Sequence, residues 1–233
     1  MWAIQDNILI ICFLIVGLIP VSFYILKARL KNILYREAFL RLGLVPSSNH
    51  GNFISNFQIG TSFMFNAKHI YHGTYKTMPV WFVYFEVPVD DQTTKQYSGV
   101  ILQTPSLHET VQIYDIKSEF APIFSFPKNL ESVEFDKSFN VYAPESKNAY
   151  YQLSPSAMQV LLDHKTKYDK PLNIQYYDNK FLVYSEDHLT ISESINPIEI
   201  FSQKPSEWHV KTLMNNISFI MADYYDLYQK IKN

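Results

Sequence analysis

The chain has 233 residues, of which 47% are hydrophobic, with 17 Tyr, 17 Phe and only 6 Gly, which argues against a disordered or repetitive protein and allows an anchor segment plus one domain. Its single cysteine, Cys12, excludes an intrachain disulfide, a zinc site built from several cysteines and a cysteine nucleophile in the domain. The net charge of −2 is uneven, because residues 42–233 hold 20 acidic and 15 basic residues and carry −5, which argues against nucleic acid as a partner.

The N-terminal segment is a long apolar run. Between Asp6 and Lys27 lie 20 uncharged residues, about the length that crosses a ~30 Å hydrocarbon core as a helix. A cleaved signal peptide would begin with basic residues and end with small ones, whereas this segment begins MWAIQDN and ends SFYILKAR. Residues 1–26 are therefore predicted to form a short exterior N-terminus and a retained transmembrane helix, which tolerates Pro20.

A basic flank follows the apolar run, with five basic residues against the single acid Glu37. Because positively charged flanks stay in the cytoplasm, residues 44–233 are expected inside a single-pass protein of the cell membrane. Residues 27–43 are predicted to form a basic juxtamembrane helix that Gly43 and Pro46 end. This flank either sets the topology alone or also recognises anionic lipid. Its basic residues are Lys27, Arg29, Lys31, Arg36 and Arg41.

Beyond the flank, short segments rich in Phe, Tyr, Val and Ile recur between turn signals, which predicts strands. Strands joined by short turns pair with their neighbours, so we expect a twisted, largely antiparallel sheet. Asp178 and Asn179 predict a tight hairpin, because both residue types tolerate left-handed backbone, and a second hairpin is expected at residues 90–95. The predicted strands are SFMFNAKHIY, PVWFVYFEVP, SGVILQT, TVQIYDI, SVEF, SFNVYA, LNIQYY and KFLVYS.

Two helices are predicted among these strands. Ser154 as N-cap and Pro155 at the first helical position indicate one inserted helix. A long amphipathic helix is expected from near Ser206, with apolar residues at helical spacing up to Ile231. The predicted fold class is α+β: an N-terminal transmembrane helix, then an antiparallel domain over residues 44–233, somewhat like pleckstrin-homology-type architecture.

One stretch carries a family resemblance. The sequence F-N-V-Y-A, Phe139 to Ala143, is followed by Glu145, Ala149, Tyr150 or Tyr151 and L-S-P at Leu153 to Pro155. This resembles the core signature of a bacterial membrane-anchored family of unknown function, over roughly residues 130–233. The resemblance implies membrane attachment and a closing C-terminal helix. It supplies no catalytic residue, because the activity of that family is itself unknown.

Polar residues that could carry chemistry have simpler interpretations. His69 and His72 are three apart, which sends them to opposite faces of a strand and does not favour a metal site. Ser185 to His188, S-E-D-H, combines an alcohol, acids and an imidazole, but catalytic triads come from separate loops, and a polar loop is the simpler interpretation. We assign no catalytic residue, metal or cofactor. The remaining acids fit a solvated turn and a strand surface: Asp90, Asp91, Glu131, Glu134 and Asp136.

Three tyrosine pairs are a candidate recognition surface, because tyrosine gives contact area with a polar tip. The alternative is that each pair places one ring in the core and one at the surface. The second members, Tyr151, Tyr177 and Tyr225, are the candidate residues.

Two functions are compatible with these features. The favoured hypothesis is a membrane-tethered cytoplasmic binding or scaffold module that associates with a membrane protein or with further copies of itself. The alternative is a membrane-anchored, hydrolase-like enzyme with an unidentified carboxylate/His site. Whether the protein is an enzyme is therefore left open, although the lack of phosphate-binding glycine motifs and of any convincing catalytic cluster favours the module.

Overall fold

The structure is a computed structural model that describes residues 2–47, 66–88, 94–118, 127–168, 170–186, 189 and 195–232. Side chains are described for these residues except 2–18, 66–68, 87–88 and 106–109. The chain forms two compact units. Unit 1 comprises Met1–Leu42 and Thr190–Asn215, and unit 2 comprises Gly43–Leu189 and Asn216–Asn233. The expected boundaries at residues 26 and 43 stay a prediction.

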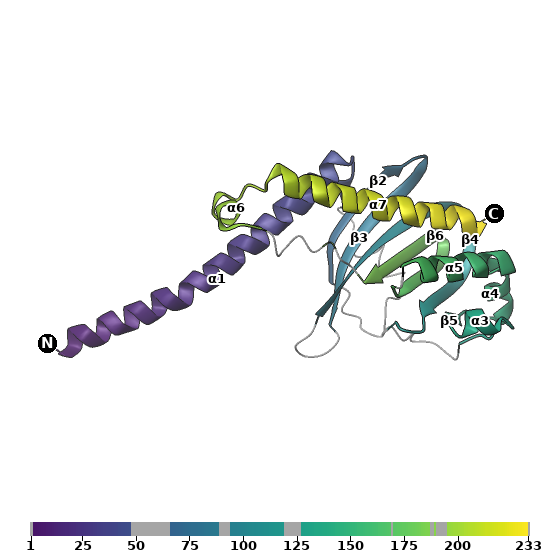
Figure 1. Ribbon diagram of the computed structural model, residues 1–233, viewed down its shortest axis with the longest axis horizontal. Helices are drawn as coiled ribbons and strands as arrows, with labels where there is room; N and C mark the ends of the chain where they lie inside the picture. The colour runs from purple at the N-terminus through teal and green to yellow at the C-terminus, as the bar shows by residue number, and fades with distance from the viewer. Residues whose placement is uncertain are drawn as a thin grey trace. The chain divides into compact units, whose positions relative to one another are not determined.

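Unit 1 is helical. Helix α1, Trp2–Arg41, runs without a break through the two segments that the sequence analysis separated, and the short helix α6, Pro197–Ser202, lies beside it (Figure 1). Gly43 follows the end of α1 with a φ of 76°, a conformation that glycine adopts at no steric cost. Among the described residues, no helix is both long enough and apolar enough to cross a membrane.

Helix α6 and helix α7, Glu207–Lys232, each begin with an N-cap. The Asn196 side chain accepts a hydrogen bond from the Glu199 backbone N–H at 2.9 Å, and Pro197 occupies the first turn of α6. The Ser206 hydroxyl accepts from the His209 backbone N–H at 3.3 Å, which starts α7 where the sequence predicted it. The α6 helix was not predicted. Helix α7 contributes its first residues to unit 1 and those from Asn216 onward to unit 2.

Unit 2 contains a six-stranded sheet among the described residues, antiparallel throughout, which confirms the expected sheet type. Each strand from β1 to β4 pairs with the next one in sequence. Strand β6 pairs with β4 along the edge opposite to β3 and β5. The hairpin expected at residues 90–95 joins β3 to β4, from Val80↔Leu102 to Pro88↔Thr94, and its tip lies outside the described residues. The strands are β1 Val45–Pro46, β2 Asn66–Tyr75, β3 Met78–Pro88, β4 Thr94–Asp115, β5 Phe139–Tyr142 and β6 Leu172–Glu186.

Two strands are longer than the sequence predicted. SGVILQT and TVQIYDI are parts of the 22-residue strand β4, and the hairpin expected at Asp178 is wrong, because LNIQYY and KFLVYS form the single strand β6. Both halves of β6 pair with β4, with register shifts on either side of the pair His108↔Asp178. Asp178 does have a left-handed φ of 52°, but this conformation forms an irregularity within a ladder and not a turn.

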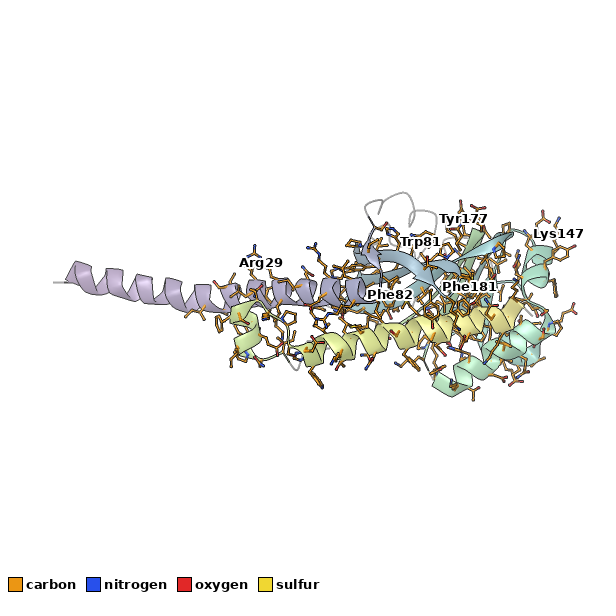
Figure 2. The ribbon with its side chains drawn as sticks, turned by 90° about the horizontal axis from the view of Figure 1, so that it is seen from above. Arg29, Trp81, Phe82, Lys147, Tyr177 and Phe181 are labelled. Atoms are coloured by element: carbon orange, nitrogen blue, oxygen red, sulfur yellow. The ribbon has the colours of Figure 1, made fainter. Side chains whose placement is uncertain are left out.

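The alternation of strand side chains divides the core of unit 2 between the two faces of the sheet. Figure 2 shows Phe82 and Phe181 on the side where α7 runs and Trp81 and Tyr177 on the opposite side. On the α7 side, the rings of Phe181 and Tyr228 lie 5.0 Å apart. The opposite face holds an aromatic-rich core cluster, against which Trp81 and Tyr177 pack: Ile70, Val83, Phe85, Tyr97, Ile101, Tyr114, Leu182 and Tyr184.

Three helices lie between β5 and β6 or just before β5: α3 Val133–Asp136, α4 Ser146–Gln152 and α5 Pro155–Tyr168. The inserted helix α5 is confirmed, with the Ser154 hydroxyl accepting from the Ala157 N–H at 3.2 Å. The strand expected at SVEF is wrong. A strand would place Val133 and Phe135 on one face, whereas α3 exposes Val133 and buries Phe135 against Phe139 at a ring distance of 5.0 Å. The likeness to pleckstrin-homology architecture stays a prediction.

Candidate functional site

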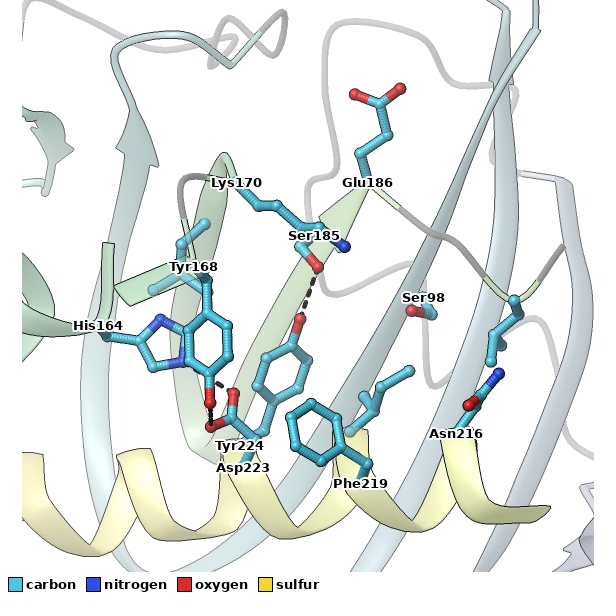
Figure 3. A pocket seen from close by; sticks show the side chains of 13 residues that line it. Ser98, His164, Tyr168, Lys170, Ser185, Glu186, Asn216, Phe219, Asp223 and Tyr224 are labelled. Atoms are coloured by element: carbon cyan, nitrogen blue, oxygen red, sulfur yellow. Dashed lines mark hydrogen bonds and ion pairs between the residues drawn. The ribbon is translucent and has the colours of Figure 1, made fainter. Parts of the chain in front are cut away.

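The candidate site is a pocket of about 240 Å³ within unit 2, bounded by α5, α7 and strands β4 and β6 (Figure 3). This volume is below the roughly 300–1,000 Å³ that is usual for small-molecule sites, and it suits a side chain or a small group. Helix α7 lines one wall through residues at positions i, i+3, i+4, i+7 and i+8, which lie on one helix face. These wall residues are Asn216, Phe219, Ile220, Asp223 and Tyr224.

The remaining walls follow from simple periodicities. Ser98 lies on β4 with Val100 and Leu102, on the face of the sheet toward α7. His164 and Tyr168 stand four residues apart on α5 and therefore share a face. Leu172 and Leu189 are both nearly fully buried and supply apolar surface to the pocket.

A hydrogen-bonded cluster joins α5 to α7 at one end of the pocket. The Asp223 carboxylate lies 2.9 Å from His164 Nε2 and accepts a hydrogen bond from the Tyr168 hydroxyl at 2.6 Å. Because an ionised carboxylate only accepts hydrogen bonds, Nε2 is the protonated ring nitrogen of His164. The rings of His164 and Tyr168 also lie 4.6 Å apart. Both oxygens of Asp223 are thus occupied.

The electrostatics of this cluster favour an ionised Asp223. Burial raises the pKa of the Asp223 carboxyl, but the hydrogen bonds from His164 and Tyr168 and the nearby Lys167 lower it more, so that the pKa lies below its ordinary value. Burial and the hydrogen bond to Asp223 raise the pKa of the Tyr168 hydroxyl. Lys167 donates to the same hydroxyl at 2.7 Å. Near neutral pH the cluster therefore holds a carboxylate and a neutral tyrosine.

A second polar pair lies nearer the middle of the pocket. The hydroxyls of Ser185 and Tyr224 are 2.7 Å apart, and Figure 3 draws this contact apart from the Asp223 cluster. Ser185 therefore bonds to Tyr224 and not to His164, so the geometry of a nucleophile activated by a histidine is not formed. What remains is an apolar hollow with fixed polar groups along it, an arrangement that can orient a bound group.

We expect the Asp223 cluster to make stability depend on acidic pH. The pKa of Asp223 is lowered by folding, so its stabilisation is present above the unfolded value of about 3.9 and is lost as the pH falls through the folded value. Urea unfolding of the detergent-solubilised full-length protein should show wild type more stable than D223N at pH 7. The difference should shrink below about pH 4. A difference that stays constant from neutral to acidic pH would contradict this assignment.

The basic residues expected at the membrane flank all lie on α1. Arg29 is exposed and points away from the helix in Figure 2. Arg41, in the last turn, forms ion pairs with Glu37 and with Glu207, the latter at 2.7 Å, so it ties α1 to the first turn of α7 within unit 1. Arg36 is exposed, whereas Lys27 and Lys31 are half-buried.

The three tyrosine candidates differ in exposure, and their role as a recognition surface stays a prediction. Tyr151 is 81% exposed on α4 beside the exposed Tyr150. Tyr177 is half-buried next to a buried Tyr176, and Tyr225 is half-buried next to a buried Tyr224. In the last two pairs, the first ring is thus buried and the second is half-buried. Tyr225 also contacts Lys76, whose Nζ lies 4.3 Å from the ring centroid.

The other polar candidates are dispersed. His69 is half-buried and His72 exposed on β2, at positions whose side chains alternate across the strand. Ser185 and Glu186 of S-E-D-H reach the pocket, whereas residues 187 and 188 lie outside the described residues, as do Asp90 and Asp91. Glu134 and Asp136 lie in α3, and Glu131 precedes it with a φ of 61°. Within the described part of the chain, no group of three His, Cys, Asp or Glu is placed to hold a metal.

Sequence reasoning missed His164, Tyr168 and Asp223. The four-residue spacing of His164 and Tyr168 was a usable signal, because it places both on one face of the predicted helix. Asp223 gives no local signal beyond being a polar residue of the predicted C-terminal helix. Nothing local joins them, since Asp223 is 59 residues from His164.

A second buried polar cluster lies in unit 1 and was also missed. The Glu199 carboxylate accepts from the Asn196 side-chain amide at 3.0 Å and from the Ser206 backbone N–H at 3.2 Å, and it lies 2.9 Å from His209 Nδ1. Ser206 Oγ is 2.6 Å from the same Nδ1. A catalytic relay uses both ring nitrogens of the histidine. Here Ser206 and Glu199 both contact Nδ1 of His209, so the arrangement differs from that of a relay. The cluster joins α6 to α7.

Comparison with known proteins gives a family without a known activity. Residues 95–222 match the family described as "Protein of unknown function (DUF3137)", which is more than half of the chain, and the chain belongs to this family. The expected resemblance to a family of unknown function is confirmed at that level, and the match begins before residue 130. No curated protein matches the chain.

One similar solved structure is the crystal structure of the mycobacterial trehalose monomycolate transport factor A, TtfA. It is 14% identical in sequence, with a TM-score of 0.46, and the match covers 82% of this chain and 93% of that chain. A likeness at this level carries no functional inference for this chain.

Proposed function

We propose that this protein is a membrane-tethered binding module whose pocket between α5, β6 and α7 receives an apolar side chain of a protein partner. The observation that carries this proposal is Phe219, which is 61% exposed and lines the same pocket as the buried Leu172 and Leu189. An exposed aromatic residue beside a side-chain-sized hollow is the usual form of an interface anchor. The partner is a membrane protein or a second copy of this chain.

The tether is supported by the sequence of α1. The 20 uncharged residues between Asp6 and Lys27 would rise about 30 Å as a helix, which matches the hydrocarbon core. Confinement of both partners to one membrane raises their effective concentration, so that a small pocket can suffice for association. We place the basic flank and residues 44–233 on the cytoplasmic side, because the basic residues follow the run.

The topology has a direct test. Protease added to intact cells should leave residues 44–233 uncut, because the proposed orientation puts them behind the membrane. The same protease should digest them after the cells are permeabilised. Digestion of the domain without permeabilisation would show that the orientation is wrong.

The association has its own test in the Phe219→Ser variant. Removal of a central aromatic anchor typically costs at least about 2 kcal/mol of binding energy, or roughly a thirtyfold loss of affinity. We expect cross-linking in native membranes, followed by mass measurement in mild detergent, to give a complex for wild type and much less for F219S.

Val133→Ser provides the matched control, because Val133 is also an exposed apolar residue, 71% exposed on α3. V133S should form the complex as wild type does. Equal loss in both variants, or a lone monomer for the wild type, would remove the support for association through this pocket.

An enzyme is the second candidate, and the His164–Asp223 pair is the observation that favours it, since a carboxylate that orients a histidine is common in hydrolases. It is less well supported, because the hydroxyl of Ser185 bonds to Tyr224. If hydrolysis were the function, D223N would abolish it while association through Phe219 remained.

A further inference from the structure

Helix α6 is apolar on two faces, although it has only six residues, Pro197–Ser202. Ile200 is buried, with 1% of its surface exposed, whereas Ile198 and Phe201 are 78% and 68% exposed. Ile198 and Phe201 stand three apart and so lie on the same side of the helix. A contiguous exposed apolar patch is a typical mark of a site that contacts protein or membrane.

The buried side of α6 is fixed to one level of α1. Ile195 and Ile200 form a core cluster with Leu30, against which Phe23 and Leu26 pack. The rings of Phe23 and Phe201 meet edge to face at 6.1 Å. Gln203 Nε2 donates to the Leu26 carbonyl at 3.0 Å. These contacts all fall on residues 23–30 of α1, and Figure 1 shows α6 beside this part of the helix.

That level of α1 is where its surface changes from apolar to basic. Val21, Tyr24 and Ile25 are exposed apolar residues, and the basic residues begin at Lys27. Phe23 stands four residues before Lys27, which is about 6 Å along the helix axis. An interfacial helix buries its apolar face about 5–10 Å into the boundary between headgroups and acyl chains. The distance between Phe23 and Lys27 along α1 therefore falls within the depth range of an interfacial helix.

The charges around α6 fit the same environment. Its single acid, Glu199, turns inward and is buried against His209, so the exposed side of the helix carries no carboxylate. Lys204 is exposed just after the helix, and Trp208 is 62% exposed at the start of α7. Lysine and tryptophan are enriched at membrane interfaces.

We propose that α6 lies in the interfacial region of the bilayer, with Ile198 and Phe201 inserted below the headgroups beside the point where α1 leaves the membrane. This proposal rests on the proposed membrane tether and adds a second, lateral contact with lipid. Such a contact fixes the rotation of α1 about its axis and holds the start of α7 at the membrane surface.

Spin labels on the full-length protein can test this contact in vesicles of phosphatidylcholine and phosphatidylglycerol. In a background with Cys12 replaced by serine, labels are placed singly at I198C, F201C and V133C. Collisions with oxygen, which concentrates in the bilayer, are compared with collisions with a water-soluble nickel complex. We expect labels at positions 198 and 201 to favour oxygen and the label at position 133 to favour nickel. The F201C substitution removes the ring contact between Phe201 and Phe23 and with it part of the packing of α6. The label at position 198 replaces a residue outside this contact and therefore reports on α6 with its packing unchanged.

The unmodified protein, labelled at its own Cys12, separates the two proposals, because Cys12 lies within the 20-residue apolar run. A Cys12 label that favours nickel would overturn the tether itself. A Cys12 label in the bilayer together with nickel-accessible labels at 198 and 201 would overturn the interfacial helix alone. Labels at 198 and 201 that are shielded from both reagents would show a protein partner on this face and would also overturn the proposal.

Discussion

Replacement of Phe181 by alanine is expected to lower the free energy of unfolding of unit 2 by about 3–5 kcal/mol, the usual loss for a fully buried phenylalanine. Phe181 has no exposed surface, and its ring lies 4.9 Å from Tyr176 and 5.0 Å from Tyr228. It therefore joins two parts of β6 and the last turns of α7. Removal of the ring leaves a cavity between sheet and helix that two large aromatic residues cannot readily fill.

Urea unfolding of the detergent-solubilised full-length protein, followed by tryptophan fluorescence, measures this loss. The exposed Val133→Ala substitution should change the free energy of unfolding by no more than about 0.5 kcal/mol. If F181A and V133A unfold at the same urea concentration, the packing of α7 against β6 is not as the structure shows.

Replacement of Glu199 by alanine is expected to lower the free energy of unfolding of unit 1 by about 1–3 kcal/mol, the usual cost of leaving a buried donor without its acceptor. The carboxylate is the acceptor for the Asn196 amide and the Ser206 backbone N–H and lies 2.9 Å from His209 Nδ1. Without the carboxylate, these donors lose their acceptor. Water cannot readily replace it, because the site is buried and His209 is only 4% exposed. The α6–α7 connection should then open more often.

Hydrogen exchange of the backbone amides of residues 198–204 and 206 reports this opening. Glu199→Gln keeps the shape of the side chain and one carbonyl acceptor. The backbone amides of the α6–α7 connection should therefore exchange more slowly in E199Q than in E199A and faster than in wild type. Equal exchange in wild type and E199A would show that Glu199 does not hold this connection.

Local signals account for the elements that the sequence predicted correctly. Ser154 and Pro155 define the start of α5 by capping chemistry alone, and Ser206 does the same for α7, because these interactions lie within one turn of the chain. The same signal was present at Asn196, Pro197 and Glu199. It was missed because α6 is short and lacks a helical apolar period.

The misread elements depend on distant partners. Asp178 has the backbone conformation of a turn residue, yet β6 continues, since both of its halves pair with one strand of 22 residues. Val133 and Phe135 alternate as in a strand, but the burial of Phe135 against Phe139 stabilises a single helical turn. Strand preference depends on neighbours in this way.

The pocket could not be predicted for the same reason. Asp223 meets His164 and Tyr168 only after α5 and α7 pack in unit 2, and the bonds span 59 and 55 residues. The exposure of Phe219 is equally invisible in sequence, because its neighbours Ile217 and Met221 belong to the same apolar helix and are buried.

Association through the pocket is the central claim, and photo-cross-linking at position 219 tests it most directly. A benzophenone amino acid replaces Phe219 in the full-length protein, and a second variant carries it at Val133. Both are irradiated in native membranes and analysed by mass. We predict a discrete protein adduct of reproducible mass from position 219 and none from position 133. No protein adduct at 219, or the same adducts from both positions, would contradict the claim that this pocket binds a protein partner.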